Sequence, residues 1–175
     1  MKHFLRWLSI LPALLMLLLI FGFSAQDGAT SGSLSYKVSY WIVCLFDRIF
    51  SLDYSELSLL AKAEDIQLLI RKLAHVTEYF LLTLSIFLPL RIWIPYQGIS
   101  STGRLYLFRL VLPAGILSLL FAGLDEFHQS FVPGRCGTPL DVLVDSIGIV
   151  VACIFLILCN LCIKKRRRLH KPYAE

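Results

Sequence analysis

Seven side chains that can carry charge or form strong hydrogen bonds lie between positions 125 and 145 of the sequence: Asp125, Glu126, His128, Gln129, Arg135, Asp141 and Asp145. The first four directly follow a long apolar run, and the two aspartates fall inside the next one. An ionisable side chain at membrane depth costs about 2.5–3.5 kcal/mol on insertion scales, so such residues generally serve a purpose. These side chains can transfer protons or bind a charged head group, and we expect the chemistry of the chain to centre on them.

A second polar set opens an earlier apolar run: Arg71, Lys72, His75, Glu78 and Tyr79. His75, Glu78 and Tyr79 are spaced i, i+3 and i+4, which places them on one face of a helix. His75 and Glu78 can form a structural pair there, or they can belong to a site.

Composition shows what must position these residues. The 175 residues are 57% hydrophobic and only 17% charged, with a mean hydropathy of +0.73. Soluble domains average roughly 45–50% apolar residues, so the chain reads as one integral membrane domain. We predict an all-α bundle with spans at about 4–23, 73–94, 105–124 and 139–163, each long enough to cross about 30 Å of hydrocarbon.

The first span has a rival interpretation as a cleaved signal peptide, because Lys2, His3 and Arg6 precede it. Its apolar run is longer than usual for such a peptide, and the residues around position 23 make a poor cleavage site, so we favour a retained span.

Basic residues predict the orientation. The tail at 164–175 begins with five consecutive lysines and arginines, and such a block beside a span indicates the cytoplasm. Four spans then place the N-terminus there too, so we expect a multi-pass protein of the plasma membrane with both termini inside. The tail is not expected to bind nucleic acid, because no soluble domain surrounds it.

The segment between the first two spans lies outside in this topology. It opens with a turn-rich stretch at 26–33 and continues with amphipathic sequence. We predict one or two helices that lie on the membrane surface or cap the bundle, either as a cover or as a lid.

This topology brings the polar residues of all four spans to one outer face. Along the fourth span, Asp141, Asp145, Gly148 and Ala152 form one stripe, whose small residues allow a neighbouring helix to approach closely. The two carboxylates need compensation, for which Arg135, Lys72, Arg71 and the histidines are available. Asp141 has a purely structural alternative, because acids stabilise helix N-termini, whereas Asp145 lies about a turn deeper.

Metal and disulfide chemistry have weak signals. No tight ligand spacing such as His-Glu-x-x-His is present, so we predict no metal and no cofactor. Cys159 and Cys162 match a redox motif without its partner fold. Cys44 and Cys136 both fall outside, and the sequence leaves their pairing open.

These residues resemble those of the VanZ-like family of small bacterial membrane proteins. The resemblance covers nearly the whole chain and rests on three motifs: FSAQ at 23–26, the pattern RKxxHxxEY at 71–79, and DExHQxFxPGR at 125–135 with Asp141, Asp145 and Gly148 after it. It implies a link to low-level resistance to the lipoglycopeptide teicoplanin, the property associated with the founding member.

Two functions fit these observations. The first is a binding protein for membrane lipids, a lipidated envelope intermediate or a lipoglycopeptide, with these contacts: Gln26, Lys72, Glu126, Gln129, Arg135, Asp141 and Asp145. The alternative is an enzyme, a transferase or hydrolase, whose acid–base candidates are His75, Glu78, Asp125 and His128. In a third interpretation the polar cluster only fixes the register of the helices.

Overall fold

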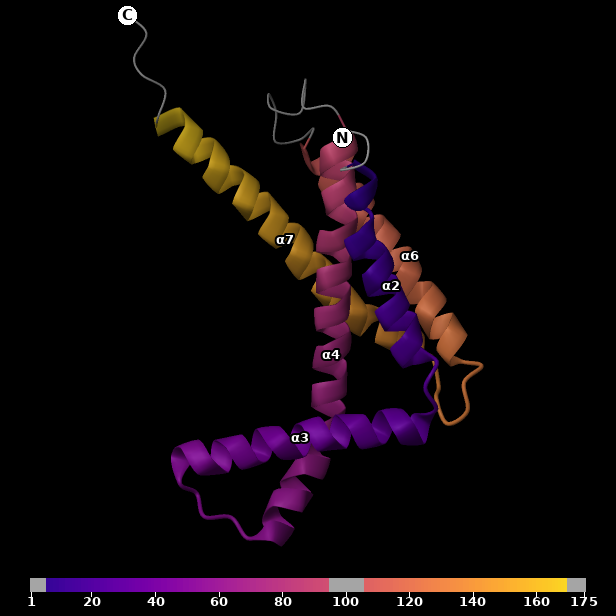
Figure 1. Ribbon diagram of the computed structural model, residues 1–175, viewed down its shortest axis with the longest axis vertical. Coiled ribbons are helices and arrows are strands. Elements are labelled where there is room, and N and C mark those ends of the chain that lie inside the picture. The colour runs from indigo at the N-terminus through magenta and orange to yellow at the C-terminus, as the bar shows by residue number, and fades with distance from the viewer. Residues whose placement is uncertain (1–5, 95–105, 170–175) are drawn as a thin grey trace, which may run out of the picture.

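The computed structural model describes residues 6–94 and 106–169, and these residues are helical with short connections. The elements in chain order are α2 (Leu11–Ser24), α3 (Gly28–Phe50), α4 (Glu56–Trp93), the π-helical turn η1 (Leu107–Val111), α6 (Leu112–Gln129) and α7 (Pro139–Leu169). α2, α4, α6 and α7 form a bundle, and α3 lies crosswise at one end of it (Figure 1).

Four helical segments are long and apolar enough to cross a membrane: Arg6–Ser24, Glu56–Trp93, Leu107–Gln129 and Pro139–Arg166. Large apolar side chains point outward along them, as Leu18 and Leu120 do with 71% and 60% of their surface exposed. An outward apolar surface of this kind suits lipid. The all-α prediction with four membrane-spanning helices is confirmed. The predicted tail at 164–175 is helical as far as Leu169, and the rest of it lies outside the described residues.

The helix that contains the second predicted span extends well beyond it. α4 has 38 residues and is therefore about 57 Å long, well beyond the roughly 30 Å of a hydrocarbon core. The stretch at 57–71, predicted as surface helix, is instead the first part of α4. Its charged residues lower the hydropathy, but no Pro or Gly occurs before Pro89 to end the helix. The charged first part of α4, at 56–71, is therefore expected to project beyond the apolar layer.

α3 is the amphipathic helix that the sequence predicts. Its first turn is capped by the Asp27 carboxylate, which accepts a hydrogen bond from the Thr30 amide at 2.6 Å. This hydrogen bond lowers the pKa of Asp27. α3 is tied to the projecting part of α4, where Gln67 donates to the Gly32 carbonyl at 2.8 Å. Because α3 marks one end of the bundle, we call it the α3 end.

α4 and α7 cross closely just inside the α3 end. A Cβ atom on Gly148 would lie 2.0 Å from the carbonyl oxygen of Val76, so no larger residue fits at this crossing. Asp145 and Ala152 flank it and are almost fully buried. The predicted stripe of small residues is confirmed, and its partner helix is α4. Beyond the crossing, α7 diverges from the other helices (Figure 1).

Candidate functional site

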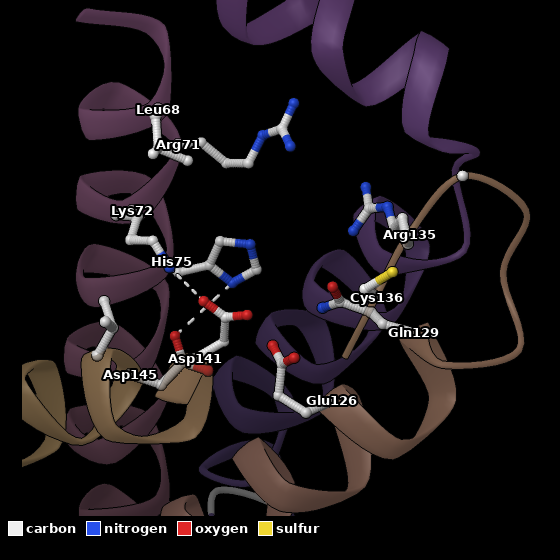
Figure 2. Close-up of a pocket in the computed structure, with 12 residues that line it drawn as sticks. Leu68, Arg71, Lys72, His75, Glu126, Gln129, Arg135, Cys136, Asp141 and Asp145 are labelled. Atoms are coloured by element: carbon white, nitrogen blue, oxygen red, sulfur yellow. Dashed lines mark hydrogen bonds and ion pairs between the residues drawn. The ribbon is translucent and has the colours of Figure 1, made fainter. Parts of the chain in front are cut away.

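The α3 end contains a cavity of about 180 Å³, which we call the polar cavity (Figure 2). α4, α6, α7 and the loop at 130–138 contribute to its wall. Its charged and amide side chains are Arg71, Lys72, His75, Glu126, Gln129, Arg135, Asp141 and Asp145. The structure therefore brings together residues that are more than seventy positions apart in the sequence.

A second cavity of about 230 Å³ lies between α3 and the bundle. We call it the apolar cavity, because side chains such as Leu34, Val38 and Ile70 form much of its wall. Three residues line both cavities: Arg71, His75 and Arg135. These three form the partition between a polar compartment and an apolar one.

Two glycines position Arg135. A Cβ atom on Gly28 would lie 2.0 Å from the Gly134 carbonyl oxygen, and the Gly28 amide donates to the Pro133 carbonyl at 3.0 Å. Gly134 adopts a φ of +71°, which L side chains rarely adopt. The start of α3 is thus locked to the loop that carries Arg135.

The Arg135 guanidinium is anchored at one atom only. Its Nη2 donates to the Phe23 carbonyl at 2.8 Å, whereas its Nε is buried without a hydrogen-bond partner. Burial lowers the pKa of Arg135, and the neighbouring Arg71 guanidinium lowers it further. An arginine nevertheless stays protonated at neutral pH. Figure 2 shows both guanidinium groups pointing into the space between α4 and the loop.

Asp141 is fully engaged in structure. Its carboxylate forms an ion pair with Lys72 and accepts a hydrogen bond from the Thr138 hydroxyl at 2.8 Å. The Asp141 amide donates back to the same hydroxyl at 3.2 Å. These reciprocal hydrogen bonds with Thr138 favour the structural interpretation of Asp141. The ion pair also engages the Lys72 ammonium group.

His75 lies between two carboxylates without a hydrogen bond to either. Its Nδ1 is 3.8 Å from an Asp145 oxygen and 3.9 Å from a Glu78 oxygen. Nδ1 of His75 and Oδ2 of Asp145 are buried and lack hydrogen-bond partners. Both distances are too long for a hydrogen bond and suit an ion pair if the imidazole is protonated. This arrangement offers a base with two acids beside it.

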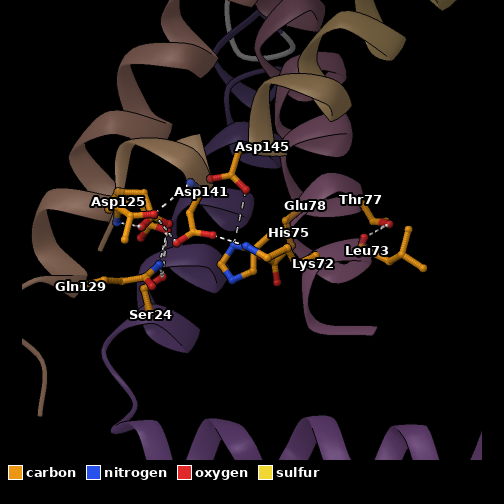
Figure 3. Close-up of polar contacts among 12 residues, drawn as sticks. Ser24, Lys72, Leu73, His75, Thr77, Glu78, Asp125, Gln129, Asp141 and Asp145 are labelled. Atoms are coloured by element: carbon orange, nitrogen blue, oxygen red, sulfur yellow. Dashed lines mark hydrogen bonds and ion pairs between the residues drawn. The ribbon is translucent and has the colours of Figure 1, made fainter. Parts of the chain in front are cut away.

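Asp125 belongs to a hydrogen-bond network with Ser24 and Gln129 (Figure 3), although its Oδ1 is buried without a partner. Its Oδ2 accepts hydrogen bonds from Ser24 and from Gln129, each at 2.9 Å, and Gln129 also donates to Ser24 at 3.0 Å. Asp125 is fully buried and lines neither cavity. The network joins α2 to α6, so the structure gives Asp125 a connecting position.

The remaining predicted residues separate into three places. Glu126 is buried in the polar cavity, where it accepts a hydrogen bond from the Thr138 amide at 3.1 Å. Gln26 and Glu78 line the apolar cavity. His128 lines neither, and its ring lies against Phe21 of α2, with 6.0 Å between centroids. The histidine next to the carboxylates is therefore His75.

Arg71 is not among the ligand contacts predicted from the sequence, although its neighbour Lys72 is. Arg71 and His75 are spaced i and i+4, so the two side chains lie on the same face of the helix. This spacing was the signal in the sequence that could have identified Arg71 as a site residue. Lys72 does not share it, since Lys72 is three residues from His75.

The sequence leaves open whether Cys44 and Cys136 form a disulfide, and the structure shows that they do not. Cys44 and Cys136 are both free thiols, and Cys136 is exposed at the α3 end. Within residues 6–94 and 106–169, no three His, Cys, Asp or Glu side chains are placed to hold a metal ion.

Fold and site together define a class: a helical membrane protein whose described residues include four helices long and apolar enough to cross a membrane, with a polar cavity at one end of the bundle. A family profile described as VanZ/LLP1 matches residues 9–160. The chain belongs to the VanZ/LLP1 family, which confirms the resemblance drawn from the motifs. No curated protein matches the chain significantly, and no solved structure does so.

Proposed function

We propose that the polar cavity binds the head group of a cell-envelope amphiphile at the outer face of the plasma membrane. The observation that carries this proposal is the partition: the polar side chains of Arg71, His75 and Arg135 stand between a polar and an apolar compartment. An amphiphile needs both compartments next to each other. A lipidated envelope intermediate and a lipoglycopeptide such as teicoplanin both have this character.

Orientation is part of this proposal. The basic segment at 164–168 favours a cytoplasmic C-terminus, which places the α3 end outside. Cys136 offers a direct test, because it is exposed at the α3 end. In a variant that keeps only Cys136, we expect a membrane-impermeant maleimide to label intact cells. Labelling only after lysis would contradict this orientation.

The function is tested by Arg135→Ala in a teicoplanin-susceptible host that expresses the chain. We expect resistance to be lost while the amount of protein in the membrane stays the same. Arg48→Ala is the matched control, because Arg48 is exposed on α3 and lines neither cavity. Unchanged resistance in Arg135→Ala would contradict a role of this cavity in resistance.

An enzymatic function on the same kind of substrate is the second candidate. It is favoured by His75, whose imidazole lies between the carboxylates of Asp145 and Glu78 within reach of both cavities. A histidine so placed can act as general base or acid in a transferase or hydrolase. His75→Gln separates the two functions: an enzyme would lose turnover of envelope lipid in reconstituted vesicles, whereas a binding protein would keep its affinity within a few-fold.

A further inference from the structure

Of the lysine and arginine side chains that line the polar cavity, one forms an ion pair and two do not. Lys72 forms an ion pair with Asp141. Within the described part of the chain, neither Arg71 nor Arg135 has a carboxylate oxygen within ion-pair distance. The Arg71 contact is a long hydrogen bond of 3.4 Å from its Nε to the Ser35 hydroxyl. Apart from Nε of Arg71 and Nη2 of Arg135, the donors of both guanidinium groups have no hydrogen-bond partner in the described residues.

Two neighbouring guanidinium groups repel each other, and burial makes that repulsion more costly. Here Arg71 lowers the pKa of Arg135, which reflects this proximity. An anion between them would turn the repulsion into attraction. Two planar forks offer more donors than the two oxygens of one carboxylate can accept, and they match the several oxygens of a phosphate.

The surroundings show that this phosphate would belong to a lipid. On one side of the two arginines lies the apolar cavity, with Leu34 and Val38 of α3 in its wall. Leu34 is 47% exposed and Val38 is 44% exposed, so both side chains could contact a lipid chain. Each buried methylene group of a chain there would contribute about 0.8 kcal/mol.

On the other side lie carboxylates that need donors. Glu126 and Asp145 face the polar cavity, and no lysine or arginine in the described residues forms an ion pair with either. Hydroxyl or ammonium groups are the partners that such acids accept. A cavity of about 180 Å³ limits the substituent to a small one.

We propose that Arg71 and Arg135 form a clamp for the phosphate of a phosphate-ester lipid. The lipid chain enters the apolar cavity under α3, and a small hydroxyl- or amine-bearing substituent enters the polar cavity. This inference rests on the proposed function and deepens it by naming the chemical class of the ligand and by assigning Arg71 a role.

The experiment titrates the full-length protein in a maltoside detergent, which carries no phosphate, and follows adducts by native mass spectrometry. The three probes are dioctanoyl phosphatidylglycerol, dioctanoylglycerol and inorganic phosphate. We expect the phospholipid to bind at least tenfold more tightly than either of the other two. Arg71→Gln and Arg135→Gln should each weaken phospholipid binding about tenfold or more, because each removes charge-assisted hydrogen bonds.

Three further variants sharpen the result. Arg48→Gln should leave the affinity unchanged, since that exposed arginine lines neither cavity. Val38→Trp should weaken binding of the phospholipid and leave that of inorganic phosphate unchanged. If Arg135→Gln does not elute as the wild-type protein does, Arg135→Lys and Arg71→Gln replace it, because Arg71 contributes only one long hydrogen bond to the fold.

Each contrary outcome has its own meaning. Equal binding of dioctanoylglycerol and the phospholipid, unaffected by either arginine, would overturn the clamp and leave the proposed function in place. If inorganic phosphate binds as tightly as the phospholipid, the proposed place of the lipid chain in the apolar cavity is wrong. A loss in Arg48→Gln as large as in Arg71→Gln would reduce the effect to general surface attraction and overturn the clamp. If neither lipid binds, the proposed function fails together with the clamp.

Discussion

The two ends of the bundle are built on opposite principles. At the α3 end the buried residues include Asp125, Glu126, Gln129 and Asp145. At the other end, which we call the apolar end, the buried cluster consists of Tyr106, Leu110, Val111 and Leu156. Buried polar groups without full partners cost stability, whereas apolar packing supplies it. On this contrast, the apolar end is expected to contribute more to stability, and the α3 end carries the polar groups on which the proposed binding function depends.

The close crossing of α4 and α7 lies between the two ends and fixes both. Because Gly148 touches the α4 backbone, the position of Asp145 relative to His75 depends on this contact.

The largest effect is expected from Gly148→Ala at the crossing. The added Cβ would lie 2.0 Å from a backbone oxygen, so the helices must separate. We expect a loss of about 3 kcal/mol in the free energy of unfolding, at the upper end for overpacking. The midpoint of thermal unfolding in detergent measures it. Gly123→Ala is the control, since nothing lies within 4 Å of that Cβ, and an equal loss there would contradict the role of the crossing.

Leu110→Ala tests the apolar end. Leu110 is fully buried, and its truncation should cost about 2 kcal/mol, near the lower limit for buried leucines because lipid is as apolar as the core. Ligand binding should stay the same in the protein that remains folded. Leu120→Ala, at a position 60% exposed, should have little effect on thermal unfolding. A loss of binding in Leu110→Ala would show that the ends are not independent.

Asp145→Asn tests the α3 end in the opposite sense. The substitution keeps the shape and removes a buried acid whose Oδ2 has no hydrogen-bond partner. We expect unfolding stability to stay the same or to rise by about 1 kcal/mol, and head-group binding to fall. Thermal unfolding and binding are measured on the same preparation. A clear drop in stability with unchanged binding would assign Asp145 to the structure.

The smallest effect is expected between the ends, where the Thr83 hydroxyl donates to that of Ser118 at 3.0 Å. Both residues are fully buried, and hydrogen bonds between membrane helices contribute about 0.6 kcal/mol on average. Thr83→Val should lower stability by about that amount in a chemical unfolding series. Thr77→Val provides the comparison, because the exposed Thr77 hydroxyl bonds only to Leu73 of its own helix. Equal losses would mean that the contact between helices adds nothing.

The sequence predicted most of the fold because hydropathy acts over whole segments. Long apolar runs indicate spans wherever they occur, and charge placement suggests how they are ordered across the membrane. α4 begins well before the second predicted span, because charged residues such as Lys62 and Glu64 end an apolar run without ending a helix. Hydropathy measures contact with lipid, whereas helix termination depends on Pro, Gly and capping residues.

For the site, the sequence supplied the polar residues and their gathering at one end, since alternating spans must bring them there. The register at Gly148 was also readable from the spacing of small residues. What the sequence could not supply is pairing. Lys72 and Arg71 are neighbours in the chain, yet one is held by Asp141 and the other is left with its donors available.

The local periodicity and hydropathy of each segment were enough to predict the helices, the four candidate spans and which end of the bundle would be polar. The tertiary structure alone decided that Arg71 and Arg135 share a partition between two cavities. It also decided that His128 turns away from them. Such placements depend on contacts such as Gly28 against Gly134, between segments about a hundred residues apart, for which no local pattern exists.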